Sequence, residues 1–238
     1  MTAFRYDLHV HSCLSPCGED DMTPNNIAGM AHLNGLELVA LTDHNACGNC
    51  PAFFRACEQY GIVAVAGMEL TTAEDIHLVC LFETLQEAMA FDEILGAYRM
   101  RIPNKVAIFG QQLILDENDE PIREEPYYLP IATTLGLEEA VTLVRTHGGA
   151  CHPAHIDREA NGLLATLGMF PPTPVFSFAE LHDGDKASLC GGRERLVCSD
   201  AHRLWELKEG GEPILLDAEK DDADGVRRAL LRWLRGEA

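Results

Sequence analysis

Histidine and acidic residues occur in short clusters at both ends of the chain. His9 and His11 form a His-x-His pair near the start, and Asp200 and His202 lie near the end. Each cluster follows a short apolar run of the kind that forms a strand. One such pair is weak evidence, because alternation along a strand places both rings on one face by default. Recurrence at both ends predicts a metal site assembled from several strand ends.

Further clusters lie between these two, each at or beside the end of an apolar run. They are Thr42-Asp43-His44, Gly67-Met68-Glu69, the isolated His77 and Cys151-His152-Pro153. Imidazoles and carboxylates suit zinc, iron and manganese, and one carboxylate can bridge two cations roughly 3.5–4 Å apart. Two cations at this distance can bind the same water molecule and lower its pKa. We therefore expect hydrolysis by a metal-bridging hydroxide, with no nucleophile supplied by the protein.

Apolar runs and helical patterns alternate along the chain. The strand-like runs lie at 4–10, 36–41, 62–66, 76–82, 149–152, 175–181, 196–199 and 213–216, and helical patterns lie at 24–32, 51–59, 85–98, 136–145 and 225–234. Alternation of this kind predicts an α/β fold with a parallel sheet. About eight strands could close into a barrel whose site lies at the carboxyl ends of the strands.

One segment interrupts this alternation. Residues 111–115 and 121–128 read as the strands of a hairpin around the turn 116–119. We interpret the segment at about 84–135 as an insertion into a single domain that spans 1–238. A solvent-exposed elaboration is the simpler interpretation of it, and a lid or a dimer contact is the alternative.

Composition narrows the classes of function. The chain has 238 residues, of which 47% are apolar, and a formal net charge of −20. An acidic surface opposes binding to duplex nucleic acid, which requires clustered Lys and Arg. No apolar run has the length of a signal peptide or a membrane span, so we expect a cytoplasmic protein with no membrane partner. The nine cysteines are expected to be reduced, because their number is odd and no export signal is visible.

Taken in order, the clusters resemble the motifs of the polymerase-and-histidinol-phosphatase (PHP) domain family. The matching segments are Asp7-Leu8-His9-Val10-His11-Ser12, Leu41-Thr42-Asp43-His44, Glu69, His152-Pro153 and Ser199-Asp200-Ala201-His202. The resemblance covers most of the chain, and the motifs are specific only jointly. It implies a distorted (β/α)7 barrel with a site for two to three divalent ions. It also implies hydrolysis of phosphate esters, and the chain looks most like the small stand-alone metal-dependent phosphoesterases.

The resemblance also implies a set of metal ligands. By this comparison the first ion is held by His9, His11, Glu69 and Asp200. Glu69 would bridge to a second ion, held also by His77 and His152, and a third would lie between His44, His202 and position 17. Relatives commonly have Asp or His at that position, whereas this chain has Cys17. A thiolate is a softer ligand that favours zinc or iron over magnesium, and Asp20 or Asp21 is the alternative.

Other polar residues are assigned to substrate binding or to support of the ligands. Asp43 is expected to orient His44 or another ligand close to the catalytic Glu69, and a helix cap is its alternative role. Arg158 and Arg203 flank the metal motifs and could clamp a phosphate, although an arginine exposed only to solvent fits either position. His155 follows His152 closely and is a candidate for substrate contact.

A Cys-x-x-Cys pair supports a second hypothesis. Cys47 and Cys50 could form a redox pair or half of a metal site, and Cys13 with Cys17 offers a second pair. The chain would then be a redox- or metal-sensing protein. A noncatalytic interaction module is disfavoured, because ligand types stand at nearly every motif position. For the esterase we expect a small phosphorylated substrate, with a nucleotide, a sugar phosphate, histidinol phosphate and an oligonucleotide end as candidates.

Overall fold

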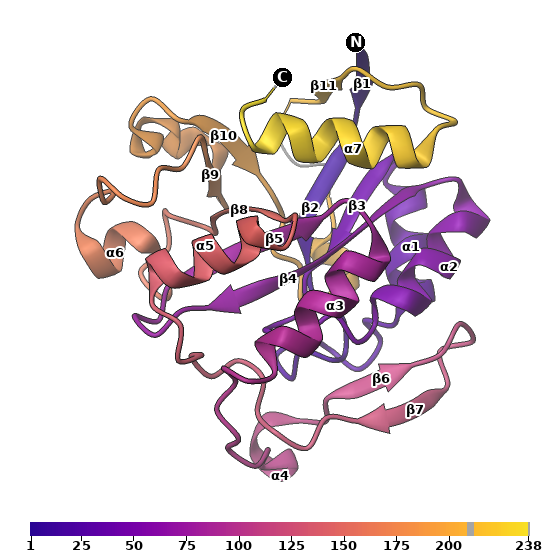
Figure 1. Ribbon diagram of the computed structural model, residues 1–238. Helices are drawn as coiled ribbons and strands as arrows, with labels where there is room; N and C mark the ends of the chain where they lie inside the picture. Colours follow the sequence, from indigo (N-terminus) through magenta and orange to yellow (C-terminus); the bar gives the residue numbers. More distant parts are fainter. Residues whose placement is uncertain (209–211, 238) are drawn as a thin grey trace.

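The centre of the protein is a sheet of five strands. The computed structural model describes residues 1–208 and 212–237, and in it the strands follow the order β2-β3-β4-β5-β8 (Figure 1). Their bounds are Tyr6–Val10, Leu38–Leu41, Val63–Thr71, His77–Phe82 and Ala150–Pro153. Every residue of these strands is buried, as near-continuous apolar runs predict.

Two further strands continue the curl of this sheet. β9 (Phe178–Leu181) and β10 (Glu194–Val197) pair in parallel. The amide of Ile156, just after β8, donates to the carbonyl of Glu180 in β9. At the other side, Val10 of β2 forms a parallel bridge with Ala201, which follows β10. The protein is therefore an α/β fold with a curled, half-barrel sheet, and the number of seven β/α units stays a prediction.

The prediction of a uniformly parallel sheet was wrong at β5. This strand runs antiparallel to both of its neighbours, β4 and β8. A tight turn joins β4 to β5 where a crossover helix would be needed for parallel pairing. In this turn the amide of Thr72 donates to the carbonyl of Ile76, and Asp75 has a positive φ of 60°.

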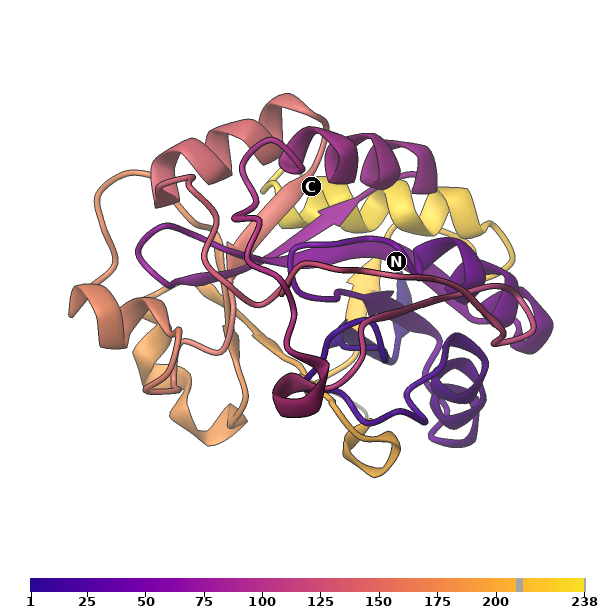
Figure 2. The same ribbon diagram turned by 90° about the horizontal axis from the view of Figure 1, so that it is seen from below.

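Most helices lie close to where the sequence predicts them, and α6 was not predicted. Their bounds are α1 Pro24–Leu33, α2 Cys50–Tyr60, α3 Leu85–Leu95, α5 Leu137–Thr146, α6 Leu163–Leu167 and α7 Ala223–Leu234. Seen from below, α3 and α5 lie along one side of the sheet (Figure 2). Thr23 caps α1 by accepting from the amide of Asn26, and Pro24 occupies its first turn. Within the described residues, no helix is long and apolar enough to cross a membrane.

The chain ends are tied together at the top of Figure 1. β1 (Thr2–Phe4) pairs antiparallel with β11 (Ile214–Leu216). α7 packs beside this pair and buries Val226 and Leu230 against the sheet. Two 3-10 turns, Gly184–Cys190 and Leu204–Glu206, complete the C-terminal half.

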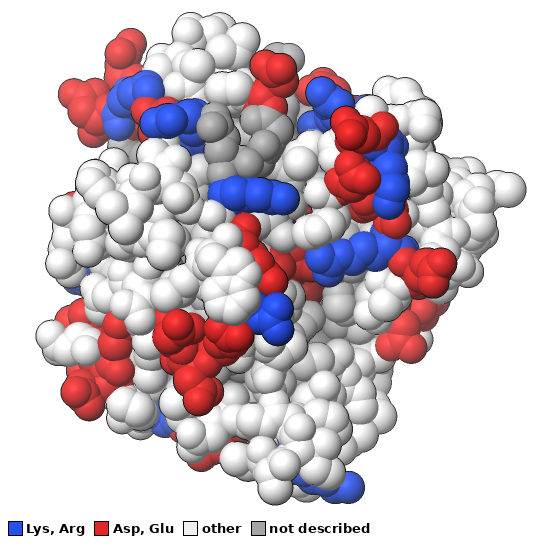
Figure 3. Space-filling view, turned by 180° about the vertical axis from the view of Figure 1, so that it is seen from behind, with Lys and Arg blue, Asp and Glu red and all other residues white. Residues whose placement is uncertain are grey.

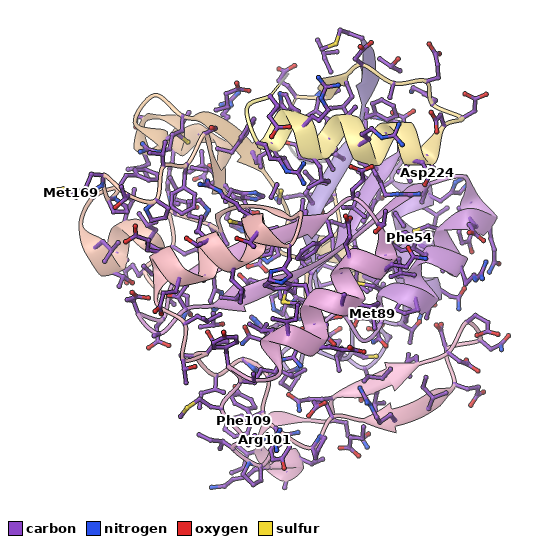
Figure 4. The ribbon with its side chains drawn as sticks, in the orientation of Figure 1. Phe54, Met89, Arg101, Phe109, Met169 and Asp224 are labelled. Atoms are coloured by element: carbon purple, nitrogen blue, oxygen red, sulfur yellow. The ribbon has the colours of Figure 1, made fainter. Side chains whose placement is uncertain are left out.

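The predicted hairpin is present below the sheet in Figure 1. It consists of β6 (Leu113–Leu115) and β7 (Pro121–Glu124), preceded by the short helix α4 (Val106–Phe109). Ile114 packs against Leu14 and Leu129, so the hairpin covers the loop that follows β2. Phe109 and Arg101 lie at the end of this segment farthest from the sheet (Figure 4). A role as a lid or a dimer contact stays a prediction.

Candidate metal centre

The two histidines of the N-terminal motif point into one buried site. His9 lies in β2 and His11 directly follows it. Their Nε2 atoms are 3.2 Å apart. The Nδ1 atoms have other partners, since His9 Nδ1 donates to Glu180 and His11 Nδ1 to the hydroxyl of Ser15. A donor bond from Nδ1 selects the tautomer whose Nε2 carries the lone pair, so both rings present a metal-binding nitrogen.

Two carboxylates complete this first group. Glu69 of β4 places Oε1 3.3 Å from His9 Nε2 and Oε2 3.4 Å from His11 Nε2. Asp200 places Oδ1 3.3 Å and 3.1 Å from the same two nitrogens. A tetrahedral ion with bonds of about 2.0–2.1 Å to nitrogen holds its donor atoms about 3.4 Å apart. The spacing of these four side chains therefore matches the coordination shell of one ion.

A second group shares the carboxylate of Glu69. His77 Nδ1 lies 2.7 Å and His155 Nε2 3.0 Å from Oε1, and His44 Nδ1 lies 3.0 Å from Oε2. His77 begins β5, so the antiparallel turn after β4 is what brings it beside Glu69. The carboxylate thus faces two sets of donors, which is the arrangement that bridging of two cations requires.

Histidines alone form the third group. The ring of His11 lies 4.2 Å from that of His202 and 4.6 Å from that of His44, centre to centre. Nδ1 of His202 donates to the carbonyl of Asp200, which leaves Nε2 free as a ligand. Cys17 is exposed and, among the residues that the structure describes, belongs to none of the three donor groups.

His152 and His155 have different ion-pair partners. Nε2 of His152 lies 3.4 Å from Oε2 of Glu180. Nε2 of His155, which the sequence suggested for substrate contact, lies 3.0 Å from Oε1 of Glu69, and the backbone has a positive φ of 25° at this residue. His155 is therefore a candidate ligand beside Glu69, where the sequence predicted His152.

Glu180 is the functional residue that sequence reasoning missed. It is buried in β9, where it accepts from His9 Nδ1 at 2.8 Å and from the amide of His155 at 3.2 Å. A signal was present in the sequence, because Glu180 stands alone among Phe178, Ala179 and Leu181 in a buried strand. Glutamate is almost never fully buried unless it is paired.

Asp43 acts through neighbouring hydroxyls. It accepts from the Ser12 hydroxyl at 2.6 Å and from the Ser15 hydroxyl at 2.7 Å. Ser15 in turn accepts from Nδ1 of His11 at 3.0 Å and from the amide of His44 at 3.1 Å. Through Ser15, Asp43 is therefore connected to two candidate ligands, His11 and His44, and its role in supporting them stays a prediction.

Opposite charges shift the protonation of the cluster. Burial disfavours the charged form of Glu69, but His77, His9 and His44 outweigh it and hold the pKa of this carboxyl well below its usual range. Burial likewise opposes the charged form of His11, yet its close contacts with the carboxylates of Asp200 and Glu69 raise its pKa to about 9. Without metal, protons on histidine thus balance the carboxylates.

The charges and the unpaired atoms fit bound cations. The buried atoms His44 Nδ1 and Asp200 Oδ1 lie 3.0–3.3 Å from other donor atoms of the cluster, but neither makes a hydrogen bond of good geometry. A buried polar atom without a partner carries a desolvation cost, which an ion bound at that atom would remove. The donors are imidazole and carboxylate, a set that suits zinc, iron or manganese.

A hollow of about 550 Å³ lies beside the centre. Arg158, Arg203 and Cys17 line it together with Asp200 and His202. The guanidinium of Arg158 contacts Asp200 and donates to His182 at 3.2 Å. Arg203 is paired with Glu19 and Glu206. Both arginines predicted for substrate binding therefore border an opening that reaches the metal donors.

The cysteine pair lies outside this opening. Cys47 and Cys50 are buried, and both thiols face the carbonyl of Gly67. Burial and the neighbouring Cys50 raise the pKa of Cys47 well above its usual value. A reactive thiol needs a lowered pKa and access to solvent, so this placement gives the redox hypothesis no support.

Comparison with known proteins identifies the family. A family model described as the PHP domain matches residues 7–132, which is more than half of the chain. The chain belongs to the PHP family. A search of the curated proteins found no match.

Solved structures with low identity have the same fold as this PHP chain. A protein described as a metal-dependent phosphoesterase from Bifidobacterium adolescentis has 17% identity and a TM-score of 0.57, with 97% of each chain covered. An amidohydrolase from Chromobacterium violaceum with bound sulfate has 20% identity and a TM-score of 0.56, covering 98% of this chain and 96% of that one. The lesion-specific endonuclease PfuEndoQ from Pyrococcus furiosus has 18% identity and a TM-score of 0.62, covering 100% of this chain and 57% of that one.

The endonuclease fold corrects one prediction. An endonuclease Q with a TM-score of 0.55 and 20% identity, matched over 85% of this chain and 50% of that one, was solved with a 27-mer duplex that has an abasic lesion at the active site. The PHP chain therefore spans only about half the length of the endonuclease chains. From the acidic composition we predicted a small phosphorylated partner and no duplex nucleic acid. That prediction was wrong.

Acidity misled this prediction because the net charge is a sum over the whole chain, whereas a substrate contacts only the surface around the site. On the face shown in Figure 3, Lys and Arg side chains lie among Asp and Glu. Arg158, Arg203 and Lys208 nevertheless line the one hollow beside the metal donors. Local positive charge of this kind can bind phosphate on an acidic protein.

Proposed function

We propose that this chain is a metal-dependent phosphoesterase that uses two to three divalent ions, zinc, iron or manganese. The observation that carries the proposal is the carboxylate of Glu69: its Oε1 lies within 3.3 Å of His9, His77 and His155, and its Oε2 lies 3.4 Å from His11 and 3.0 Å from His44. A carboxylate shared by two sets of imidazoles is the pattern of a two-metal hydrolytic site.

The proposed ligand set follows the placement of the side chains. His9, His11, Glu69 and Asp200 would hold the first ion, and the second would be held by Glu69, His77 and His155. The third would be held by His11, His44 and His202. His155 replaces His152, and Cys17 is left out because its thiol is not part of these groups. Ions in such a site activate water and neutralise charge on the transferred phosphoryl group.

Other side chains would bind the substrate or orient the metal ligands. Arg158 is placed to bind a phosphate oxygen, because its guanidinium stands at the mouth of the hollow beside Asp200. Glu180 holds the ring of His9, and Ser15 holds the ring of His11, so that Nε2 of each points to the centre. Removal of water from these buried groups strengthens their electrostatic effect on the substrate.

A substrate panel tests this proposal. Protein loaded with zinc, manganese or iron should hydrolyse at least one of a set of phosphomonoesters, phosphodiesters and a duplex with an abasic site. The duplex is included because the solved endonuclease Q holds one. Chelator should abolish the activity and added metal should restore it. Absence of hydrolysis across the panel in protein shown to carry its metals would refute the esterase.

A further inference from the structure

Trp205 lies at the rim of the hollow beside the metal centre. It belongs to the 3-10 turn Leu204–Glu206, which closely follows the proposed ligands Asp200 and His202. The side chain is 68% exposed although it lines the same hollow as these ligands. Aromatic residues with one face in a cleft are enriched at binding surfaces, because they offer a large contact area at low entropic cost.

A cation lies beside the indole. The guanidinium carbon of Arg203 lies 5.2 Å from the centre of the Trp205 ring. Arg203 is itself paired with Glu19 at 3.0 Å and Glu206 at 3.4 Å. Glu206 also accepts from the amide of His202 at 3.0 Å. These contacts connect the turn that carries Trp205 to the backbone of a proposed metal ligand.

Cations surround this aromatic face. Arg158, Arg203 and Lys208 line the hollow with Trp205, and Arg158 contacts the ligand Asp200. A nucleotide unit has a flat apolar base and a negatively charged phosphate. The indole and the neighbouring cations beside the hydrolytic centre match these two parts. The base would stack on the ring while its phosphate pairs with arginine.

We propose that Trp205 is a specificity-determining residue that stacks on a nucleobase, so that the phosphoester bound here belongs to a nucleic-acid strand. This inference rests on the proposed function for the identity of the reacting phosphate. It goes further by naming the group beside that phosphate. Stacking on one aromatic side chain changes affinity by about tenfold or more per base.

Binding can be measured without turnover. Zinc-loaded full-length protein is titrated with a short single strand whose phosphorothioate linkages resist hydrolysis, and with a strand of equal length that lacks bases. The anisotropy of a dye attached to the strand gives the affinity for every variant, and emission from Trp205 reports stacking in protein that retains this residue. Trp233 is the other tryptophan, and its ring packs 4.4 Å from that of Phe178. A Trp233→Phe background therefore isolates the signal of Trp205.

The variants separate stacking from other contacts. Trp205→Ala should lower the affinity for the base-bearing strand by about tenfold or more and leave the affinity for the baseless strand unchanged. Trp205→Phe should retain most of the affinity for the base-bearing strand. Met169→Ala is the matched control, because Met169 is 70% exposed and lies on the loop after α6 (Figure 4). A nucleoside monophosphate in the same titration separates a strand from a free nucleotide: tighter binding of the strand supports the proposal, and tighter binding of the monophosphate would overturn the assignment to a strand.

Two results would overturn the inference. If Trp205→Ala lowers the affinity for both strands equally, the ring contacts sugar or backbone. If it lowers neither affinity, the ring does not contact a nucleic-acid strand. Base-dependent binding in a protein that hydrolyses no ester would instead refute the proposed function and leave the stacking site standing. The two proposals therefore fail on different measurements.

Discussion

Nδ1 of His9 lies 2.8 Å from Oε1 of Glu180, and this contact fixes which nitrogen of His9 faces the metal donors. Both side chains are buried. The carboxylate accepts the proton on Nδ1, so the lone pair stays on Nε2, next to Glu69 and Asp200. A carboxylate behind a metal-binding histidine also raises the basicity of the ring.

Glu180→Gln is therefore expected to weaken metal binding without removing a ligand. Loss of the charge behind His9 should lower zinc affinity by about 10–100-fold. Competition with a chromophoric chelator measures this, and Glu194→Gln on the neighbouring strand is the control because that side chain is exposed. Unchanged zinc affinity in a folded Glu180→Gln protein would show that the contact does not support the ligand.

Glu69→Gln is expected to abolish most hydrolysis. The amide retains the shape of the side chain but loses the charge that bridges two cations. We expect turnover to fall by about three orders of magnitude, or about 4 kcal/mol of transition-state stabilisation. Glu58→Gln, at an exposed position in α2, should keep full activity. Circular dichroism checks that both variants fold, and near-normal turnover in folded Glu69→Gln would remove this residue from the mechanism.

His155 and His152 should respond differently to substitution. His155→Ala removes a nitrogen that lies 3.0 Å from Glu69 Oε1 and should release about one equivalent of metal. His152→Gln should keep the full metal content, because His152 contacts Glu180 instead. Elemental analysis of both proteins decides between them. Loss of metal from the His152 variant alone would restore the assignment made from the sequence.

Metal affinity should rise with pH through the neutral range. The pKa of His11 is raised to about 9, because its contacts with the carboxylates of Asp200 and Glu69 outweigh the effect of burial. At neutral pH this imidazole holds a proton that the metal must displace, and the competition disappears as pH passes the pKa. Calorimetry in buffers of different ionisation enthalpy measures the protons released. Binding without proton release at pH 7 would contradict this account.

Short-range pattern predicted most of the elements and several of the side chains that meet in the candidate metal centre. The run ending at His9 and His11 became β2, and helical periodicity with Pro24 gave α1 nearly residue for residue. The motif Ser199-Asp200-Ala201-His202 placed two ligand candidates correctly beside these histidines. These features depend on neighbouring residues, so one sequence is enough to find them.

Contacts between residues far apart along the chain could not be predicted from the sequence. Glu180 belongs to the site only because β9 lies next to β8, and no local pattern encodes that neighbour. The direction of β5 depends on a turn of a few residues after Thr71, which composition alone does not distinguish from a crossover. His155 faces Glu69 through a single positive φ. Each of these was set by backbone geometry that appears only in the folded chain.

The central claim is that two cations share the carboxylate of Glu69, and anomalous scattering from crystals of the zinc-loaded protein tests it most directly. Difference maps collected at the zinc edge should show two peaks, one between Glu69 and the pair His9 and His11, the other between Glu69 and the pair His77 and His155. Their separation should be about 3.5–4 Å. One isolated peak, or peaks that leave Glu69 unligated in fully loaded protein, would contradict the account.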